Sequence, residues 1–182
     1  MNSSIKTIIM MLFLVVTLQS CNQDPSLQRY YVDSELAPGF TSLDIPTSML
    51  KIDKTTLTEE ELEAYESIEK LSLLAYVIEG DDKAEEFEVE LAKVKTILNN
   101  PKYEELMRGG NTTDGKFVVK FLGEEDSIEE IILMGASNDR GFAVVRVLGD
   151  DMNVDKIMTL TSVFEKANIN DSELKQFTNF FE

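Results

Sequence analysis

The segment between residues 103 and 148 constrains the fold most, because it holds four strand-like patterns with only short turns between them. The four patterns are Tyr103 to Arg108, Lys116 to Leu122, Ser127 to Ala136 and Gly141 to Leu148. Strands joined by such short turns pair with their chain neighbours, so the segment predicts an antiparallel meander. In the second pattern Phe117, Val119 and Phe121 point to one side and Lys120 to the other, which predicts one polar face.

Helical patterns and two further extended segments flank the meander. Residues 39–50 are expected to be extended and interrupted at Pro46, and residues 68–78 form an apolar run that is typical of a buried strand. Thr58 and Glu61 form a capping-box pattern at the start of a short helix that runs to about Ser67. Helices are also predicted over residues 83–98, over residues 154–166 and, in a tail, over residues 172–181.

The elements follow the order α-β-α-β-β-β-β-α with a helical tail, which predicts an α+β fold. We expect an antiparallel-rich sheet of about five strands with helices packed mainly on one face. We expect the chain to divide into a signal peptide (1–20), a polar tether (21–38) and a single domain (39–182), whose residues 167–182 form the helical tail.

The first twenty residues have the profile of a signal peptide. Lys6 is their only charged residue, and an apolar run from Ile8 to Val16 continues to Leu18. A helix that spans a bilayer needs about 20 apolar residues, so this run is too short to be a permanent anchor.

The four residues Leu18, Gln19, Ser20 and Cys21 resemble the lipobox of bacterial lipoproteins. The resemblance implies cleavage before Cys21, a diacylglyceryl thioether on its sulfur and, usually, acylation of the new amino terminus. The alternative is an ordinary signal peptide followed by an unpaired cysteine. Cys21 is the single cysteine of the chain, so no intramolecular disulfide can form, and lipidation explains both its number and its position. Acylated Cys21 would make the lipid bilayer one partner of the protein.

The charge of the chain excludes one class of partner. The sequence has 34 acidic and 17 basic residues, and removal of Lys6 with the signal peptide leaves 16 basic residues. Proteins bind nucleic acids through clustered lysine and arginine that neutralise phosphates, and no basic run is present here. We therefore expect no nucleic-acid partner.

The order of elements, the lipobox and the segment with Phe40, Ile45 and Pro46 resemble an uncharacterised lipoprotein family of Bacteroidota, catalogued as domain of unknown function 4252. The resemblance covers about residues 39–165. It implies the fold and an address in the cell envelope. The family carries no catalytic signature that could be transferred to this chain, so the resemblance implies no activity.

The residue types available for chemistry are few. The chain has no histidine, and lipidation would consume its only thiol, which excludes cysteine nucleophiles, Ser-His-Asp triads and histidine-ligated metals. A carboxylate pair, a Ser-Lys dyad or an oxygen-ligated cation would still be possible. No glycine-rich phosphate-binding loop is found, and we expect no cofactor.

Asp151, Asn153 and Asp155 have the spacing of the first ligands in a calcium loop. The same loop needs glycine at its sixth position and glutamate at its twelfth, where this chain has Lys156 and Ser162. We therefore expect that Asp151 or Asn153 instead caps the helix that follows, and these residues remain only a weak metal candidate.

The densest acidic cluster, at residues 124–130, is expected on a turn between two strands, where no cleft would hold paired carboxylates for acid-base catalysis. Solvated loop residues are the simpler interpretation. Asp126, Ser127 and Ile128 resemble the O-glycosylation acceptor of Bacteroidota, which makes Ser127 a weak candidate for modification.

These observations favour a non-catalytic envelope module that binds a protein or peptide, with an unknown envelope protein as its partner. The alternatives are an enzyme that uses carboxylate or Ser/Lys chemistry, and a binder of divalent cations or small ligands. Asn22 follows the lipidated cysteine in place of the aspartate that retains lipoproteins at the inner membrane. The expected location is therefore the outer membrane, on its periplasmic side.

Overall fold

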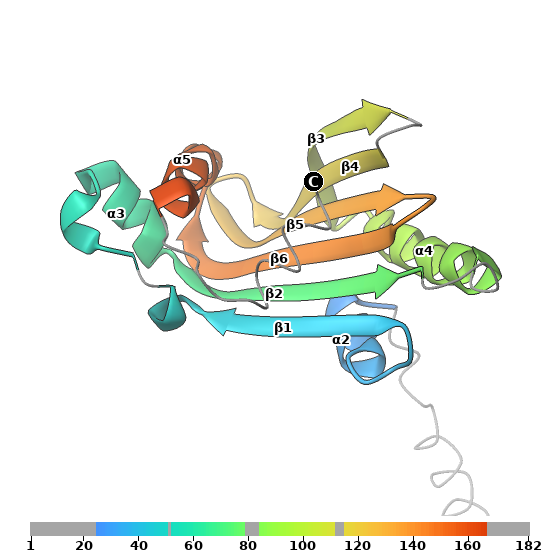
Figure 1. Cartoon of the computed structure of the whole chain (residues 1–182). Coiled ribbons are helices and arrows are strands. Elements are labelled where there is room, and N and C mark those ends of the chain that lie inside the picture. The colour runs from blue at the N-terminus through green and yellow to red at the C-terminus, as the bar shows by residue number, and fades with distance from the viewer. Residues whose placement is uncertain (1–24, 51, 79–83, 112–114, 167–182) are drawn as a thin grey trace, which may run out of the picture.

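A six-stranded antiparallel sheet forms the centre of the computed structural model, which describes residues 25–50, 52–78, 84–111 and 115–166 (Figure 1). The order across the sheet is β1-β2-β6-β5-β4-β3. The strands are β1 (Phe40–Pro46), β2 (Ile68–Val77), β3 (Tyr103–Asn111), β4 (Gly115–Glu124), β5 (Ser127–Ser137) and β6 (Gly141–Met152). The helices are α2 (Leu27–Ser34), α3 (Glu59–Glu66), α4 (Ala84–Leu98) and α5 (Val154–Lys166).

The predicted meander is confirmed, because β3, β4, β5 and β6 pair in sequence as antiparallel hairpins. Strand β6 then pairs with β2, with Phe142 opposite Tyr76. The segment expected to be extended before Pro46 is a sixth strand, β1, which pairs with β2 at the edge of the sheet. Pro46 ends that edge strand, where a residue without an N–H donor is tolerated. The α+β class is therefore correct, with six strands where about five were expected.

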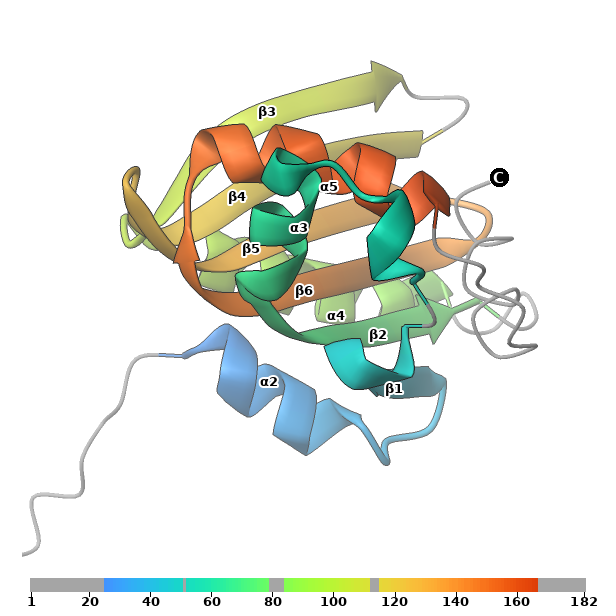
Figure 2. The same ribbon diagram turned by 90° about the vertical axis from the view of Figure 1, so that its left-hand side faces the viewer.

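One face of the sheet is covered by α3 and α5, which lie together in front of the strands in Figure 2. Helix α3 begins with the predicted capping box: Thr58 Oγ1 accepts from the Glu61 N–H, and the Glu61 carboxylate accepts from the Thr58 N–H. The buried cluster on this face contains Ala64, Ile68, Phe121, Ile128, Ile131, Met152 and Leu160.

The opposite face is covered by α2 and α4, whose buried side chains meet Leu74, Tyr76, Ile132, Phe142 and Val144 of the central strands. Helices thus pack on both faces, which corrects the expectation that they pack mainly on one. The physical reason lies in the central strands: successive residues such as 131 and 132 are both apolar and point to opposite faces, so each face must be covered.

Helix α2 lies inside the range predicted to be a tether. Its first residue, Leu27, is fully buried, and Tyr30 and Tyr31 pack into the same core cluster as α4. Ser26 caps the helix by accepting a hydrogen bond from the Arg29 N–H at 3.2 Å. The folded domain therefore begins no later than Ser26, rather than near Gly39.

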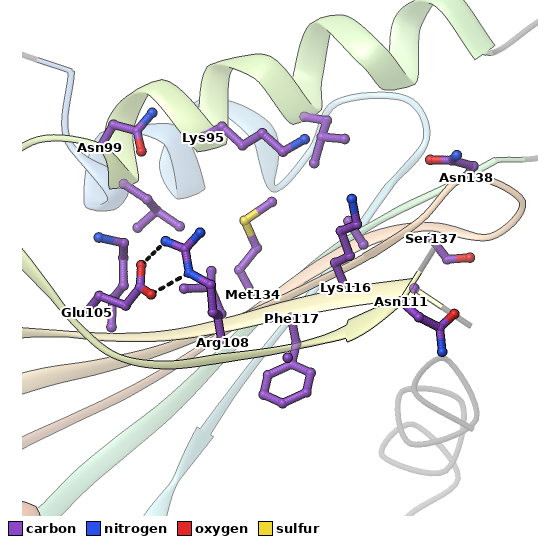
Figure 3. Close-up of a pocket in the computed structure, with 17 residues that line it drawn as sticks. Lys95, Asn99, Glu105, Arg108, Asn111, Lys116, Phe117, Met134, Ser137 and Asn138 are labelled. Carbon is purple, nitrogen blue, oxygen red and sulfur yellow. Dashed lines mark hydrogen bonds and ion pairs between the residues drawn. The ribbon is translucent and has the colours of Figure 1, made fainter. Parts of the chain in front are cut away.

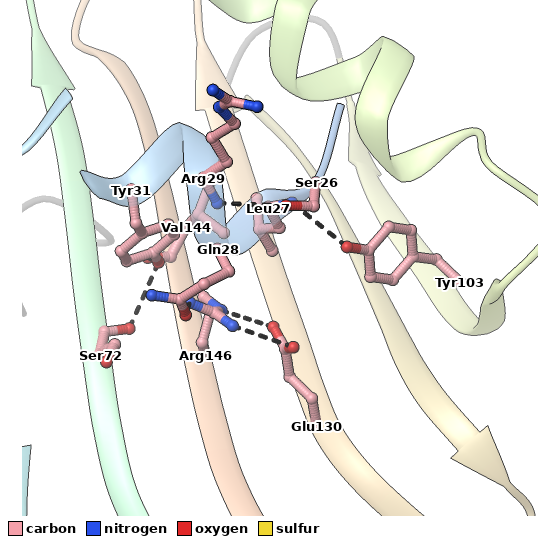
Figure 4. A network of polar contacts seen from close by, with 10 residues as sticks. All are labelled: Ser26, Leu27, Gln28, Arg29, Tyr31, Ser72, Tyr103, Glu130, Val144 and Arg146. Atoms are coloured by element: carbon pink, nitrogen blue, oxygen red, sulfur yellow. Dashed lines mark hydrogen bonds and ion pairs between the residues drawn. The ribbon is translucent and has the colours of Figure 1, made fainter. Parts of the chain in front are cut away.

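A buried ion pair between β5 and β6 lies beneath α2, and two side chains of α2 contact it (Figure 4). Arg146 on β6 donates from Nε and Nη2 to the two carboxylate oxygens of Glu130 on β5, at 2.5 and 3.0 Å. From α2, Gln28 Oε1 accepts from Arg146 Nη1 at 2.7 Å, and the Tyr31 ring lies 4.9 Å from the guanidinium carbon. The Tyr31 hydroxyl donates to the Val144 carbonyl oxygen at 2.5 Å.

No helix among the described residues is long and apolar enough to cross a membrane. The predicted signal peptide (1–20) and the predicted helical tail (167–182) lie outside the described residues.

Candidate functional site

A groove of about 350 Å³ lies between α4 and the strands β3, β4 and β5, and we refer to it as the α4 groove (Figure 3). It opens on the sheet face that carries α2 and α4. Pockets that bind ligands usually have volumes of about 300–1,000 Å³, so this one fits a small ligand or a few side chains of a larger partner.

The wall and floor of the groove are apolar because α4 and the strands bury their apolar sides toward each other. Leu91 and Leu98 of α4 form the wall, and Val118 of β4 with Met134 of β5 forms the floor. Leu91 and Leu98 are buried residues of the helix that was predicted over residues 83–98. These side chains give a ligand an apolar surface next to the polar rim.

Four basic side chains line the groove, and one acidic side chain accompanies them. The basic residues are Lys95 of α4, Arg108 of β3 and Lys116 and Lys120 of β4, and the acidic residue is Glu105 of β3. Over the whole chain acidic residues outnumber basic ones by 34 to 17. The α4 groove therefore reverses the charge balance of the protein.

Two of the four basic residues already have partners. Arg108 Nε donates to Glu105 Oε1 at 2.5 Å, and its Nη2 donates to the second carboxylate oxygen. These hydrogen bonds, with the charges of Arg108 and Lys120, hold the pKa of Glu105 below its usual value. Lys120 Nζ donates to the Tyr103 carbonyl oxygen at 2.9 Å. Glu105 is therefore an ionised partner of Arg108 and not a free general base.

The other two basic residues, Lys95 and Lys116, are exposed, and the side chain of neither forms a hydrogen bond or ion pair with another described residue. They approach the groove from opposite sides, one from α4 and one from β4 (Figure 3). Their two ammonium groups can donate hydrogen bonds to a carboxylate or a phosphate in the groove.

Strand β3 forms the outer edge of the groove and of the sheet. It pairs with β4 and with no other described strand. On the opposite face of the same two strands, the ring of Phe117 lies against Gly109, where a Cβ would come within 2.7 Å of it. Phe117 and Met107 remain 40% and 47% exposed there. The edge thus has basic side chains on one face and apolar side chains on the other.

A second hollow, of about 480 Å³, lies between α2 and α4. Its basic residues are each next to an acidic one, since Arg29 is 3.9 Å from Asp33 and Lys93 is 2.6 Å from Glu90. This hollow therefore lacks the excess of basic groups that marks the α4 groove.

Several predicted site residues are not placed. Leu18, Gln19, Ser20 and Cys21 lie outside the described residues, so the structure does not test the cleavage motif or the lipidation.

The weak metal candidate has another role in the structure. Asn153 Oδ1 accepts from the Lys156 N–H at 2.9 Å and so caps α5, as the sequence predicted. Lys156 Nζ lies 3.3 Å from the Asp151 carboxylate, and the Asp155 carbonyl oxygen accepts from Thr159 within α5. No group of three or more acidic residues in the described part of the chain is arranged to hold a metal ion.

Ser127 and the acidic residues before it lie on the turn between β4 and β5, where the sequence placed them. Ser127 is the first residue of β5 and is exposed, as are Glu124, Glu125 and Asp126. Glu130, at the end of that cluster, is instead buried as the partner of Arg146.

The α4 groove was not predicted from the sequence. Its basic residues come from one helix and two strands, and none belongs to a motif. One signal was present: residues 116, 118 and 120 place lysine, valine and lysine on one face of β4, which is the polar face predicted for that strand.

Comparison with known proteins gives one match. A family model described as "Domain of unknown function (DUF4252)" matches residues 31–160, a range that includes every residue of the α4 groove. No curated protein and no solved structure matches the chain.

Proposed function

The chain belongs to the family described as a domain of unknown function (DUF4252), and from that premise we propose that it is a membrane-anchored lipoprotein of the cell envelope that binds a protein partner without catalysing a reaction. The α4 groove is its binding site. The family description names no activity, so the support for this function comes from the sequence and the geometry of this chain.

The proposed anchor is Cys21, and it is supported by the short apolar run, the lipobox-like residues 18–21 and the absence of any other cysteine. Because Asn22 stands in place of the aspartate that retains lipoproteins at the inner membrane, we propose that the anchored protein faces the periplasm from the outer membrane. Two or three acyl chains suffice for stable anchoring, because each buried methylene contributes about 0.8 kcal/mol.

The observation that carries the proposed binding role is the reversal of charge in the α4 groove. A basic groove on a strongly acidic protein attracts acidic groups to one place and repels them elsewhere. The paired state of Glu105 and the lack of histidine in the chain favour binding over acid-base catalysis in this groove.

The anchor is tested by replacing Cys21 with alanine. In cells fed a fatty-acid analogue, the unchanged protein is expected to be labelled and found with membranes, and the Cys21→Ala variant to be unlabelled. Equal labelling of both proteins would show that Cys21 is not the lipidated residue.

The binding site is tested by photo-crosslinking in intact envelopes. A photoreactive residue at Asn99, which is exposed beside the groove, is expected to give a discrete adduct with one envelope protein. The control carries the same residue at Glu60, which is exposed on α3 on the other face of the sheet. Identical adducts from both positions, or none from Asn99, would refute a partner at the α4 groove.

A further inference from the structure

We propose that the partner presents an extended segment in which acidic and apolar residues alternate, and that this segment pairs with β3 as a seventh strand. This inference rests on the proposed function, because it names the chemistry of the partner at the same site. Its acidic side chains would enter the α4 groove, and its apolar side chains would pack on the opposite face of the sheet.

The charge of the ligand follows from the basic side chains of the groove. Lys95 and Lys116 have no partner among the described residues, and Glu105 alone offsets the four basic groups that line the groove. An acidic residue of the ligand would meet two free ammonium groups and the guanidinium of Arg108. Complementary charges of this kind set specificity and speed association.

The extended form of the ligand follows from the position of β3. Strand β3 is the last described strand of its sheet, and an edge strand offers backbone donors and acceptors to a further strand. Its pairing with β4 is irregular between Glu105 and Met107 and regular from Met107 to Asn111. The added strand would therefore pair chiefly with residues 107–110, beside Arg108 and Lys116.

The alternation follows from the two faces of that edge. Successive residues of a strand point to opposite faces, so every second side chain of the ligand would point into the α4 groove. The remaining side chains would lie near Met107 and Phe117, which are large apolar residues left exposed on the other face. A segment with acidic residues on one side and apolar residues on the other complements both faces.

The volume of the groove sets the size of what enters it. About 350 Å³ holds a few side chains and excludes a folded domain. The part of the partner that binds here is therefore a linear segment whose backbone lies along the edge of the sheet.

The proposal is tested with short fluorescent peptides and the purified full chain in detergent. A peptide that alternates valine and glutamate is expected to bind, and peptides with glutamine or lysine in place of glutamate are expected to bind about tenfold more weakly or not at all. A higher salt concentration should weaken binding of the glutamate peptide, because the charged contacts are near the surface and are screened by ions.

Paired variants locate the binding. The double variant K95Q/K116Q is expected to lose about tenfold in affinity for the glutamate peptide, whereas K93Q, on the same helix but outside the groove, should bind as the unchanged protein does. Both changed residues are exposed, so melting curves of all variants should coincide. N-methylation of the peptide amides that would face β3 should abolish binding, and N-methylation of the alternate amides should not.

Three results would overturn the inference: equal binding of the glutamate and glutamine peptides, indifference to K95Q/K116Q, or binding that survives N-methylation at every position. Displacement of the peptide by equimolar inorganic phosphate would also overturn it, by showing that the groove takes a small anion. If Asn99 crosslinks to a partner but the peptides fail these tests, only the ligand class is wrong. If the peptides bind as expected but no partner crosslinks, only the proposed function is wrong.

Discussion

Removal of the Glu130 carboxylate should destabilise the domain more than any exposed charge substitution. The side chains of Arg146 and Glu130 are only 4% and 7% exposed, and they share two hydrogen bonds. In Glu130→Ala the guanidinium would stay buried without its anion. Loss of one partner from a buried ion pair costs about 3–5 kcal/mol.

A double substitution distinguishes the cost of leaving Arg146 buried without a partner from the stability that the ion pair itself contributes. Replacement of both residues, as in E130M/R146M, removes the two charges together, and exchanges of this kind are often neutral in other proteins. Here the double variant would also lose the contacts of Arg146 with Gln28 and Tyr31, which contribute about 1–3 kcal/mol together. The double variant should therefore be at least as stable as Glu130→Ala, and the two single substitutions should not be additive.

The assay is urea unfolding followed by far-ultraviolet circular dichroism, which suits a chain without tryptophan. The control is Glu66→Ala, which breaks the exposed pair of Lys54 with Glu66 and should cost less than about 1 kcal/mol. The reasoning is refuted if Glu130→Ala costs no more than Glu66→Ala, or if the effects of the single substitutions simply add in the double variant.

Three further predictions concern helix α2, the buried Tyr31 and calcium. Leu27→Ala should lower the free energy of unfolding in urea by about 2–5 kcal/mol, because the Leu27 side chain is fully buried. The control Leu36→Ala, at an exposed position, should change it by less than about 0.5 kcal/mol. Similar values for the two variants would place α2 outside the core. Burial raises the pKa of the Tyr31 hydroxyl well above its ordinary value, so the stability that the neutral hydroxyl contributes is complete below pH 10 and is lost as the pH rises further. In an absorbance titration Tyr31 should ionise only as the protein unfolds in alkali. Ionisation of Tyr31 near pH 10 in the folded protein would contradict this. Calcium should not change the melting temperature of the unchanged protein or of Asp151→Ala, because Lys156 lies against the Asp151 carboxylate. A rise in melting temperature with calcium that disappears in Asp151→Ala would restore the cation hypothesis.

The strands of the meander could be predicted because their evidence is local. Alternation such as that of Phe117, Val119 and Phe121 fixes which side chains share a face within a single strand. The ends of the strands are less well determined: β6 continues beyond the predicted Leu148 to Met152, which pairs with Ile128 across an irregularity in the register. Pairing with β5 decides where this strand ends, and the polar residues in between give no local sign of it.

Helix α2 was missed although its pattern is present in the sequence. Leu27, Tyr30, Tyr31 and Ser34 are the buried residues of the helix, and their spacing of three, one and three is that of one helical face. The helix has only eight residues, and short helices in water are stabilised chiefly by tertiary packing. The polar residues around the pattern suggested a tether, because most of the surface that buries α2 belongs to strands and a helix more than 40 residues away in the sequence.

The α4 groove could not be predicted for a different reason. A polar stripe on a strand indicates contact with water, but it does not show whether that water lies on an open surface or beneath a helix. Lys116 and Lys120 have the same appearance in the sequence in both cases. Only the packing of α4 beside them, which depends on Leu91 and Leu98, turns the polar side of β4 into a groove.

The position of α2 also relates the proposed anchor to the proposed binding edge. The Leu27 N–H donates to the Tyr103 hydroxyl at 3.3 Å, which fixes the start of α2 against the start of β3. Cys21 precedes Leu27 by six residues, and six residues reach at most about 22 Å. If Cys21 holds the protein on a membrane, the Tyr103 hydroxyl therefore lies within about 25 Å of the lipid attachment point. Residues 107–110 lie four to seven positions further along β3, which adds about 13–24 Å. A segment that pairs there would be met within about 60 Å of the membrane surface, a distance that a partner anchored in the same membrane can reach.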